Sequence, residues 1–317
     1  MSNIKSVAII GAGALGTLYA QYLSKVPGID LFFGVGRDRY DRMKECNFVI
    51  NEVSHNFNFR NLQADSSANC VADLVIVAVK NHHLESILPL LGVCVGKNTI
   101  VMSVLNGIYS ETFLEEHFPD AVILYSVPLG MDAVKEKLNL TFSTSGKLLL
   151  GSKNNNPEEI ELKKLGNLLD SADLKYEIPE DIHRSIWWKW MINIGVNQAS
   201  AVTGASYYYF QKDKNAQILM EKAMRETILV AKAAGVDLRD KDIDDFYTVL
   251  NTLGPKGKTS MLQDIENKRK TEVDAFAGKL IELADSLGVD VPINKLLLKI
   301  IKVKESVFSD YRCEIIK

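Results

Sequence analysis

Three polar side chains stand at regular spacing in a segment that is otherwise almost entirely apolar, residues 186–200. Lys189, Asn193 and Asn197 follow one another at intervals of four residues, so a helix would carry them on one face. Burying a lysine and two amides costs free energy unless each finds a partner, so the stripe predicts a lined cavity. A desolvated ammonium there can stabilise negative charge developing on a carbonyl oxygen and can protonate it. The alternative is a snorkelling lysine beside two asparagines with satisfied hydrogen bonds.

A second group of polar residues lies further along the chain, at residues 254–274. Ser260 fits the N-cap of a capping box, and Thr271 fits the start of another helix. Two helix starts so close together predict a break near residues 268–270, which would let the chain fold back and aim Ser260 and Glu272 at one pocket. For Glu272 by itself, a first-turn acid favoured by the helix dipole is an equally good explanation.

Residues 11–16 read GAGALG, which is the GxGxxG motif of dinucleotide-binding proteins. The motif follows the apolar run of residues 7–10 and opens a stretch with apolar residues at helical spacing, which is the context it requires. The first glycine permits a tight turn, the second lets the backbone approach a pyrophosphate at the helix N-terminus, and the third lets the helix pack on the strand. A glycine-rich turn without a ligand fits this flanking pattern less well. The residues expected at the cofactor are Gly11, Ala12, Gly13, Ala14, Leu15 and Gly16.

The end of the second expected strand, residues 31–35, indicates which dinucleotide is bound. A site for NAD usually places an acid there to bind the ribose 2′-OH, but the first side chain past this strand is Arg37, whose planar fork suits a 2′-phosphate. We therefore expect NADP(H). Asp38 could instead pair with Arg37 or bind the ribose, and Arg39 is expected to be solvated. Lys80 ends a later strand at the same edge of the sheet, so it reaches the phosphate or lies at the surface, and the two alternatives are about even.

Asn106 and Gly107 directly follow the expected strand at residues 99–105. The carboxyl ends of parallel strands face the ligand crevice, so Asn106 is expected near the nicotinamide. Because Asn-Gly is also a common turn pair, this position is a weak indication by itself.

Length and composition set the class of protein. The 317 residues suffice for about two domains, and a net charge of -3 gives no basic field, so we expect no nucleic-acid partner. The longest apolar run, residues 74–79, is much shorter than the ~20 residues that cross a bilayer, and no export signal is apparent, so we expect a cytoplasmic protein with no membrane partner. No histidine or cysteine spacing fits a metal site. The cysteines are expected to be reduced thiols: Cys46, Cys70, Cys94 and Cys313.

The pattern of apolar residues divides the chain in two. Short apolar runs alternate with helical patterns over residues 1–180, which predicts an α/β fold with a doubly wound sheet of Rossmann type. Residues 138–142 and 147–150 look like a hairpin. Residues 181–317 read almost entirely as helix, so we expect an all-α C-terminal domain that carries the substrate and catalytic groups. Strands are expected at residues 7–10, 31–35, around 57–59, 74–79, 99–105 and 121–127.

Taken together, these motifs resemble those of the ketopantoate reductase (2-dehydropantoate 2-reductase) family, over essentially the whole length. The resemblance implies NADPH-dependent reduction of a small 2-keto acid, ketopantoate to pantoate, in pantothenate and coenzyme A biosynthesis. It implies that Lys189 is the general acid and that Glu272 holds Lys189 and the substrate hydroxyl in place. The remaining implied roles are cofactor binding by Arg37 and Lys80, substrate hydrogen bonds from Asn193 and Asn197, carboxylate binding by Ser260, and orientation of substrate and nicotinamide by Asn106.

Two positions depart from the family pattern. The family often has Gln before the Asn-Gly pair and Gln three residues after the lysine, where this chain has Leu105 and His83. Both lie on the cofactor side, so they bear on cofactor contacts more than on the chemistry. Another 2-keto acid, a related β-hydroxyacid dehydrogenase activity and a dinucleotide sensor without turnover remain as alternatives. The sequence leaves a homodimer open, with residues 207–210 as core, interface or pocket rim.

Overall fold

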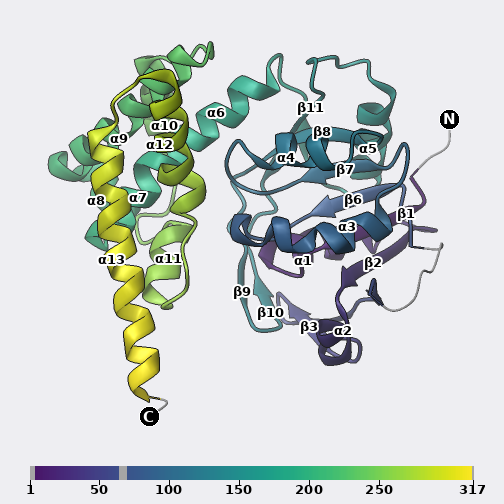
Figure 1. Ribbon diagram of the computed structural model, residues 1–317. Helices are drawn as coiled ribbons and strands as arrows, with labels where there is room; N and C mark the ends of the chain where they lie inside the picture. Colours follow the sequence, from purple (N-terminus) through teal and green to yellow (C-terminus); the bar gives the residue numbers. More distant parts are fainter. Residues whose placement is uncertain (1–3, 64–69, 316–317) are drawn as a thin grey trace. The chain divides into compact units, whose positions relative to one another are not determined.

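The computed structural model describes residues 4–63 and 70–315, with side chains up to residue 308, so the thiol of Cys313 and residues 1–3 lie outside the described part. The chain forms two compact units, Met1–Ser185 and Ile186–Lys317 (Figure 1). The strands are β1 Ser6–Ile10, β2 Asp30–Val35, β3 Asn47–Ile50, β4 Val53–Asn56, β5 Phe59–Asn61, β6 Leu74–Val77, β7 Ile100–Ser103, β8 Val122–Leu129, β9 Val134–Glu136, β10 Asn139–Thr141, β11 Lys147–Gly151 and β12 Tyr176–Glu177.

The α-helices are α1 Ala14–Leu23, α2 Arg37–Met43, α3 Leu88–Cys94, α4 Ser110–His117, α5 Ile160–Ser171, α6 Ile182–Ile192, α7 Gln198–Thr203, α8 Tyr207–Lys212, α9 Lys214–Ala233, α10 Asp240–Leu250, α11 Ser260–Glu266, α12 Lys279–Leu287 and α13 Pro292–Ile315. Two 3₁₀ turns, η1 Asn81–His83 and η2 Glu85–Ile87, precede α3. Two π-helical segments interrupt the second unit, η3 Asn193–Asn197 and η4 Asp274–Gly278. No helix among the described residues is long and apolar enough to cross a membrane.

The main sheet of the first unit has the strand order β12-β11-β8-β7-β6-β1-β2-β5. β1 pairs in parallel with β2 on one side and with β6 on the other, so the strand order reverses at β1. In open α/β sheets a ligand binds at the carboxyl ends of the strands at such a switch point. The predicted α/β fold, with a Rossmann-type sheet followed by a helical domain, is confirmed.

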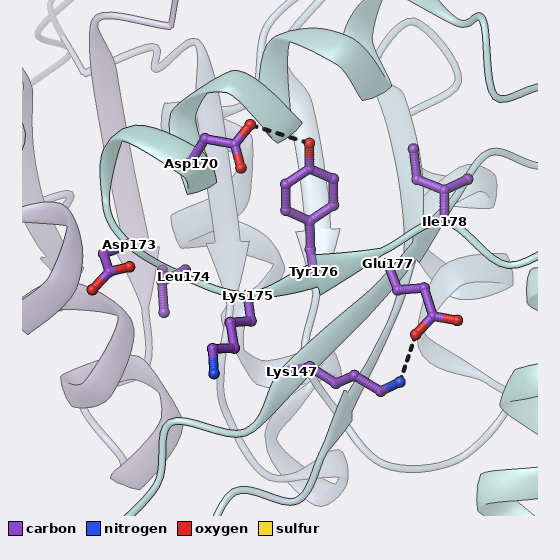
Figure 2. A pocket seen from close by; sticks show the side chains of 8 residues that line it. All are labelled: Lys147, Asp170, Asp173, Leu174, Lys175, Tyr176, Glu177 and Ile178. Atoms are coloured by element: carbon purple, nitrogen blue, oxygen red, sulfur yellow. Dashed lines mark hydrogen bonds and ion pairs between the residues drawn. The ribbon is translucent and has the colours of Figure 1, made fainter.

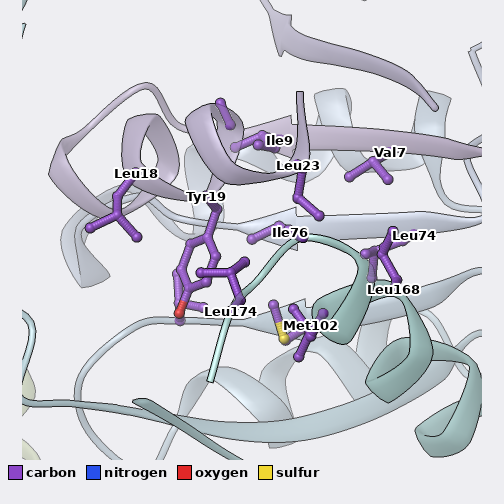
Figure 3. Close-up of a cluster of buried hydrophobic side chains, with 14 of the residues drawn as sticks. Val7, Ile9, Leu18, Tyr19, Leu23, Leu74, Ile76, Met102, Leu168 and Leu174 are labelled. Atoms are coloured by element: carbon purple, nitrogen blue, oxygen red, sulfur yellow. The ribbon is translucent and has the colours of Figure 1, made fainter. Parts of the chain in front are cut away.

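The strands of this sheet are buried on both faces, which explains why they read as continuous apolar runs. Val7 and Ile9 point into one core with residues of α1 and α5, which Figure 3 shows around Tyr19 and Leu168. Alternate residues of the same strand, such as Ala8, enter the core on the opposite face with α3 and α4. Helices on both faces make the sheet doubly wound.

The predicted hairpin of residues 138–142 and 147–150 is wrong. β10 pairs with β3 and β9 in a separate four-stranded sheet, β4-β3-β10-β9. β11 instead pairs antiparallel with β8 and parallel with β12 in the main sheet. The reason is burial: β11 is apolar on both faces, with Leu148 and Leu150 at most 1% exposed on one face and Leu149 8% exposed on the other, and the main sheet covers both.

The second unit is helical, as predicted, and the break expected near residues 268–270 is confirmed. α11 ends at Glu266, Lys268 adopts a left-handed φ of 52°, and the chain resumes helical geometry at Asp274. The predicted N-cap is wrong by one residue. Thr259, rather than Ser260, caps α11, because its hydroxyl accepts the Leu262 N–H at 3.2 Å.

Candidate active site

The glycine loop connects β1 to α1, and its three glycines differ in whether a side chain could be accommodated. Gly11 has a φ of +115°, and a Cβ there would lie 2.5 Å from the carbonyl oxygen of Ala78. A Cβ on Gly16 would lie 1.9 Å from the carbonyl oxygen of Gly11. A Cβ on Gly13 would meet nothing closer than 3.6 Å. The fold itself therefore requires Gly11 and Gly16, whereas the space beside Gly13 is open.

The N-terminus of α1 is free to bind an anion. Gly13 is its N-cap and offers no side chain to the first amides of the helix. Gly13 is exposed, whereas the neighbouring Ala12 is buried and Ala14 and Leu15 are half-buried. Backbone N–H groups and the positive end of the helix dipole thus face open space, which fits the pyrophosphate of a dinucleotide.

A matched pair of substitutions separates these roles. We expect Gly13→Ala to keep the melting temperature close to that of the unmodified protein but to weaken NADPH binding on the order of tenfold, because the methyl group occupies the open space. We expect Gly16→Ala to lower the melting temperature by several degrees, because its Cβ overlaps the backbone. Thermal denaturation and NADPH titration measure both. Normal NADPH affinity in Gly13→Ala would remove this loop from the cofactor site.

Arg37 begins α2, directly after the end of β2. Its backbone N–H donates to Oε1 of Gln63 at 3.0 Å, and its side chain is exposed. Because β2 neighbours β1, this guanidinium belongs to the same edge of the sheet as the glycine loop. Gln63 was not predicted as a site residue, since nothing in the local pattern connects it to Arg37.

Lys80 and Asn106 follow the neighbouring strands β6 and β7. Their two loops are joined by Asn81, whose Nδ2 donates to the Asn106 carbonyl oxygen at 2.8 Å. Ala78, which contacts Gly11, lies two residues before Lys80. The structure thus brings the glycine loop, Lys80 and Asn106 together at the carboxyl edge of the sheet. Asn81 was missed, because its role depends on the loop that it meets.

The two departures from the family pattern lie differently at this edge. Leu105 is only 6% exposed and packs in the core on the α3 side of the sheet. His83 is exposed at the end of η1, where its ring lies 4.2 Å from that of His82. Leu105 therefore contributes to the apolar core, and His83 lies at the surface.

A buried carboxyl group lies below the Asn106 loop. Glu111, in the first turn of α4, is only 3% exposed, and burial raises its pKa to about 7. Its Oε2 accepts a hydrogen bond from Ser110 Oγ at 2.9 Å, and Ser110 Oγ accepts one from Ser103 Oγ at 2.7 Å. Ser103 is the last residue of β7, so this chain of hydrogen bonds links α4 to the strand that leads to Asn106.

The raised pKa of Glu111 makes stability depend on pH. Between its ordinary pKa of 4.5 and about 7, folded Glu111 keeps a proton that the unfolded chain has released, so stability falls as pH rises through this range and then levels off. We expect Glu111→Gln to remove this loss, raising the free energy of unfolding at pH 8 by up to about 3 kcal/mol. Urea denaturation at pH 5 and pH 8 measures it. If Glu111→Gln changed the free energy of unfolding equally at pH 5 and pH 8, the raised pKa of Glu111 would not be the cause of the pH dependence.

The predicted polar stripe of the second unit lies on α6 and η3. Lys189 is half-buried, and desolvation lowers the pKa of its ammonium. Asn193 and Asn197 are each 5% exposed, and Asn197 Nδ2 donates to Asn193 Oδ1 at 3.2 Å. The predicted helix runs without a gap over residues 182–203, but η3 makes its middle a wider π turn between α6 and α7. A four-residue spacing does not distinguish the two geometries.

Glu272 lies in the turn before η4, and the structure connects that turn to the helix of Lys189. Trp190, which is fully buried, donates its Nε1–H to the carbonyl oxygen of Ala275 at 3.1 Å. Glu272 is half-buried, and its own carbonyl oxygen accepts N–H groups of η4. Ser260 is exposed at the first residue of α11, a helix that packs against α7 and η3.

A depression of about 680 Å³ lies elsewhere, beside the edge strand β12 (Figure 2). The Tyr176 hydroxyl donates a hydrogen bond to Asp170, and Lys147 forms an ion pair with Glu177, so these four side chains already have partners. None of the predicted site residues lines this depression, and we assign no chemistry to it. No group of three or more His, Cys, Asp or Glu side chains within residues 4–63 and 70–308 is placed to hold a metal ion.

A doubly wound sheet with a glycine loop at its switch point, followed by a helical unit, is typical of two-domain dinucleotide-binding proteins. The family model described as ketopantoate reductase PanE/ApbA matches residues 7–155, and the model of its C-terminal domain matches residues 181–305. The chain belongs to the ketopantoate reductase family.

The chain is similar over nearly its whole length to named relatives and to solved structures. The chain is 26% identical to a 2-dehydropantoate 2-reductase of Aquifex aeolicus, over 94% of this chain and 96% of the relative. It is 23% identical to one of Streptococcus pyogenes, over 96% and 99%. A dimeric ketopantoate reductase from Staphylococcus aureus superposes with a TM-score of 0.79 at 20% identity, covering 96% of this chain and 99% of that one. A D-mandelate dehydrogenase with NADH and anilino(oxo)acetate gives 0.85 at 23% identity with the same coverage.

Proposed function

We propose that this protein reduces ketopantoate to pantoate with NADPH, in pantothenate and coenzyme A biosynthesis. The observation that carries the proposal is the combination of an open glycine loop in one unit with a half-buried lysine, whose pKa desolvation lowers, in the other. Membership of the ketopantoate reductase family supports the substrate.

The proposed cofactor is NADP(H). The open space at Gly13 and the uncapped N-terminus of α1 suit its pyrophosphate. Arg37 is exposed at the end of β2, where a guanidinium can bind a 2′-phosphate in a bidentate manner, and Lys80 belongs to the same edge of the sheet. Asn106 would orient the nicotinamide and the substrate.

The proposed chemistry is a hydride transfer coupled to a proton transfer. When bound, NADPH would supply a hydride for C2 of the keto acid, and the electrons of the C=O π bond would move to the carbonyl oxygen. Lys189 donates a proton to that oxygen, which gives the 2-hydroxy acid. Because burial lowers the pKa of this ammonium, the proton leaves more readily than from a solvated lysine.

The remaining residues would hold the substrate and the lysine. Asn193 and Asn197 would hydrogen-bond the substrate, since both amides are buried beside each other on η3. Ser260 would bind the carboxylate through its exposed hydroxyl. Glu272 would hold the Lys189 ammonium and the product hydroxyl in place. We also propose a cytoplasmic enzyme and, as in the dimeric relative, a homodimer.

The test is NADPH oxidation, followed at 340 nm, with ketopantoate beside a panel of other 2-keto acids, repeated with NADH. We expect the highest kcat/KM with ketopantoate and NADPH. Turnover of another 2-keto acid alone would replace the proposed substrate. No turnover of any keto acid, with NADPH still bound tightly, would instead indicate a dinucleotide sensor.

A further inference from the structure

The π segment η3 lies between the proposed proton donor and the helix that follows it, and one side chain compensates for its altered backbone. At its end, the Gln198 N–H donates to the carbonyl oxygen of Gly195. The side-chain amide of Gln198 donates to the carbonyl oxygen of Ile194 at 2.8 Å. π segments inside helices are rare and often occur at functional sites. Here the residue that closes the segment also caps one of its carbonyl groups.

The Gln198 amide is in turn fixed by a buried network. Its Nε2 also donates to Oδ1 of Asn294 at 2.8 Å, so both amide protons are used. Asn294 Nδ2 donates to Glu226 Oε2 at 2.8 Å and to the Ala223 carbonyl oxygen at 3.2 Å. Gln198 and Asn294 are fully buried and Glu226 is 7% exposed. Because a backbone carbonyl and a carboxylate can only accept here, each amide nitrogen must face these oxygens, which fixes the orientation of both amide groups.

The network ties α7 to two long helices. Glu226, on α9, accepts the backbone N–H groups of Ile293 and Asn294 at 2.8 and 2.9 Å and so caps the start of α13. At the other end of α7, Lys304 Nζ donates to the carbonyl oxygens of Ala201 and Val202, each at 2.7 Å. α13 therefore holds α7 near both ends.

The segment itself is pressed against α9. A Cβ on Gly195 would lie 2.4 Å from Cγ of Met224, so only glycine allows this approach. The arrangement also has a cost, since Oε1 of Gln198 is buried without a hydrogen-bond partner among the described residues.

We propose that Gln198 is a positioning residue: held by Asn294 and Glu226, it maintains the π geometry of η3 and thereby aims Asn197, and the proposed donor Lys189, at the substrate. The proposal rests on the proposed function. Without the Gln198 amide, the Ile194 carbonyl oxygen loses this donor, and the segment relaxes toward the hydrogen-bond pattern of an α-helix. That relaxation turns the residues before η3 relative to those after it.

The test compares Gln198→Met with Gln217→Met. Gln217 Nε2 donates to the Phe210 carbonyl oxygen at 3.1 Å, so the control makes the same chemical change on α9 and away from η3. We expect Gln198→Met to lower kcat/KM for the keto acid about tenfold or more, with an unchanged KM for NADPH, and Gln217→Met to leave both unchanged. In an Asn197→Ala background, Gln198→Met should lower kcat/KM by a clearly smaller factor than in the unmodified protein, because part of its effect acts through Asn197.

Hydrogen exchange separates this proposal from the proposed function. We expect faster amide exchange at residues 193–199 in Gln198→Met, and not in Gln217→Met, whether or not a keto acid is turned over. An inactive unmodified protein with this exchange pattern would overturn the proposed function and support the role of Gln198 in η3. Unchanged exchange at residues 193–199, or an active Gln198→Met enzyme with normal kcat/KM, would overturn the positioning role.

Discussion

Replacing Lys189 with alanine is expected to lower kcat for keto acid reduction about a thousandfold while NADPH still binds. The ammonium is the group proposed to neutralise charge on the substrate oxygen and to protonate it, and alanine does neither. The cofactor residues belong to the other unit, so the dissociation constant for NADPH should stay within about twofold. Steady-state kinetics and fluorescence titration with NADPH measure the two effects.

The pH dependence gives a second signature of the same residue. Because burial lowers the Lys189 pKa below 10.5, the protonated form that acts as an acid is lost at a lower pH than in a solvated lysine. We therefore expect kcat for reduction to fall as pH rises through this pKa, and this alkaline limb to disappear in Lys189→Ala. Lys241→Ala, which removes an 82% exposed lysine from α10, is the control and should keep the limb. Near-normal kcat in Lys189→Ala would exclude Lys189 as the donor.

Arg37→Ala is expected to reduce the preference for NADPH over NADH, measured as the ratio of kcat/KM values, about 10- to 100-fold. A guanidinium bound to the 2′-phosphate discriminates between the two cofactors because only NADPH carries that phosphate. The loss should appear in kcat/KM for NADPH, with the value for NADH almost unchanged.

Arg42→Ala is the matched control on the same helix. Arg42 is exposed, and its Nε donates to the Asp38 carbonyl oxygen at 3.1 Å, so its removal changes the local charge equally. It should leave the cofactor preference within about twofold. An unchanged preference in Arg37→Ala would transfer the 2′-phosphate to another cation, with Lys80→Ala as the next variant. Equal losses in Arg37→Ala and Arg42→Ala would indicate a general electrostatic effect.

The fold class, the family and most of the strands can be predicted from the sequence. Buried parallel strands are continuous apolar runs, and helices carry apolar residues at helical spacing, so both are visible in short windows. The glycine motif was interpretable for the same reason, because its strand and helix are its immediate neighbours. The structure adds the reason why glycine is needed at two of these positions. A Cβ on Gly11 would overlap the backbone of Ala78, and a Cβ on Gly16 would overlap the backbone of Gly11.

Which distant segments meet cannot be predicted from local sequence patterns and is seen in the three-dimensional structure. β10 and β11 do not form the expected hairpin. β10 pairs with β3 and β11 pairs with β8, because apolar burial on both faces of β11 outweighs proximity in the chain. Gln198 and Asn294 are 96 residues apart, and no local period encodes their hydrogen bond. The π turn of η3 keeps the four-residue spacing of Asn193 and Asn197 and is therefore hidden in the sequence. Its geometry depends on close packing of Gly195 against Met224, which exists only once α9 is in place.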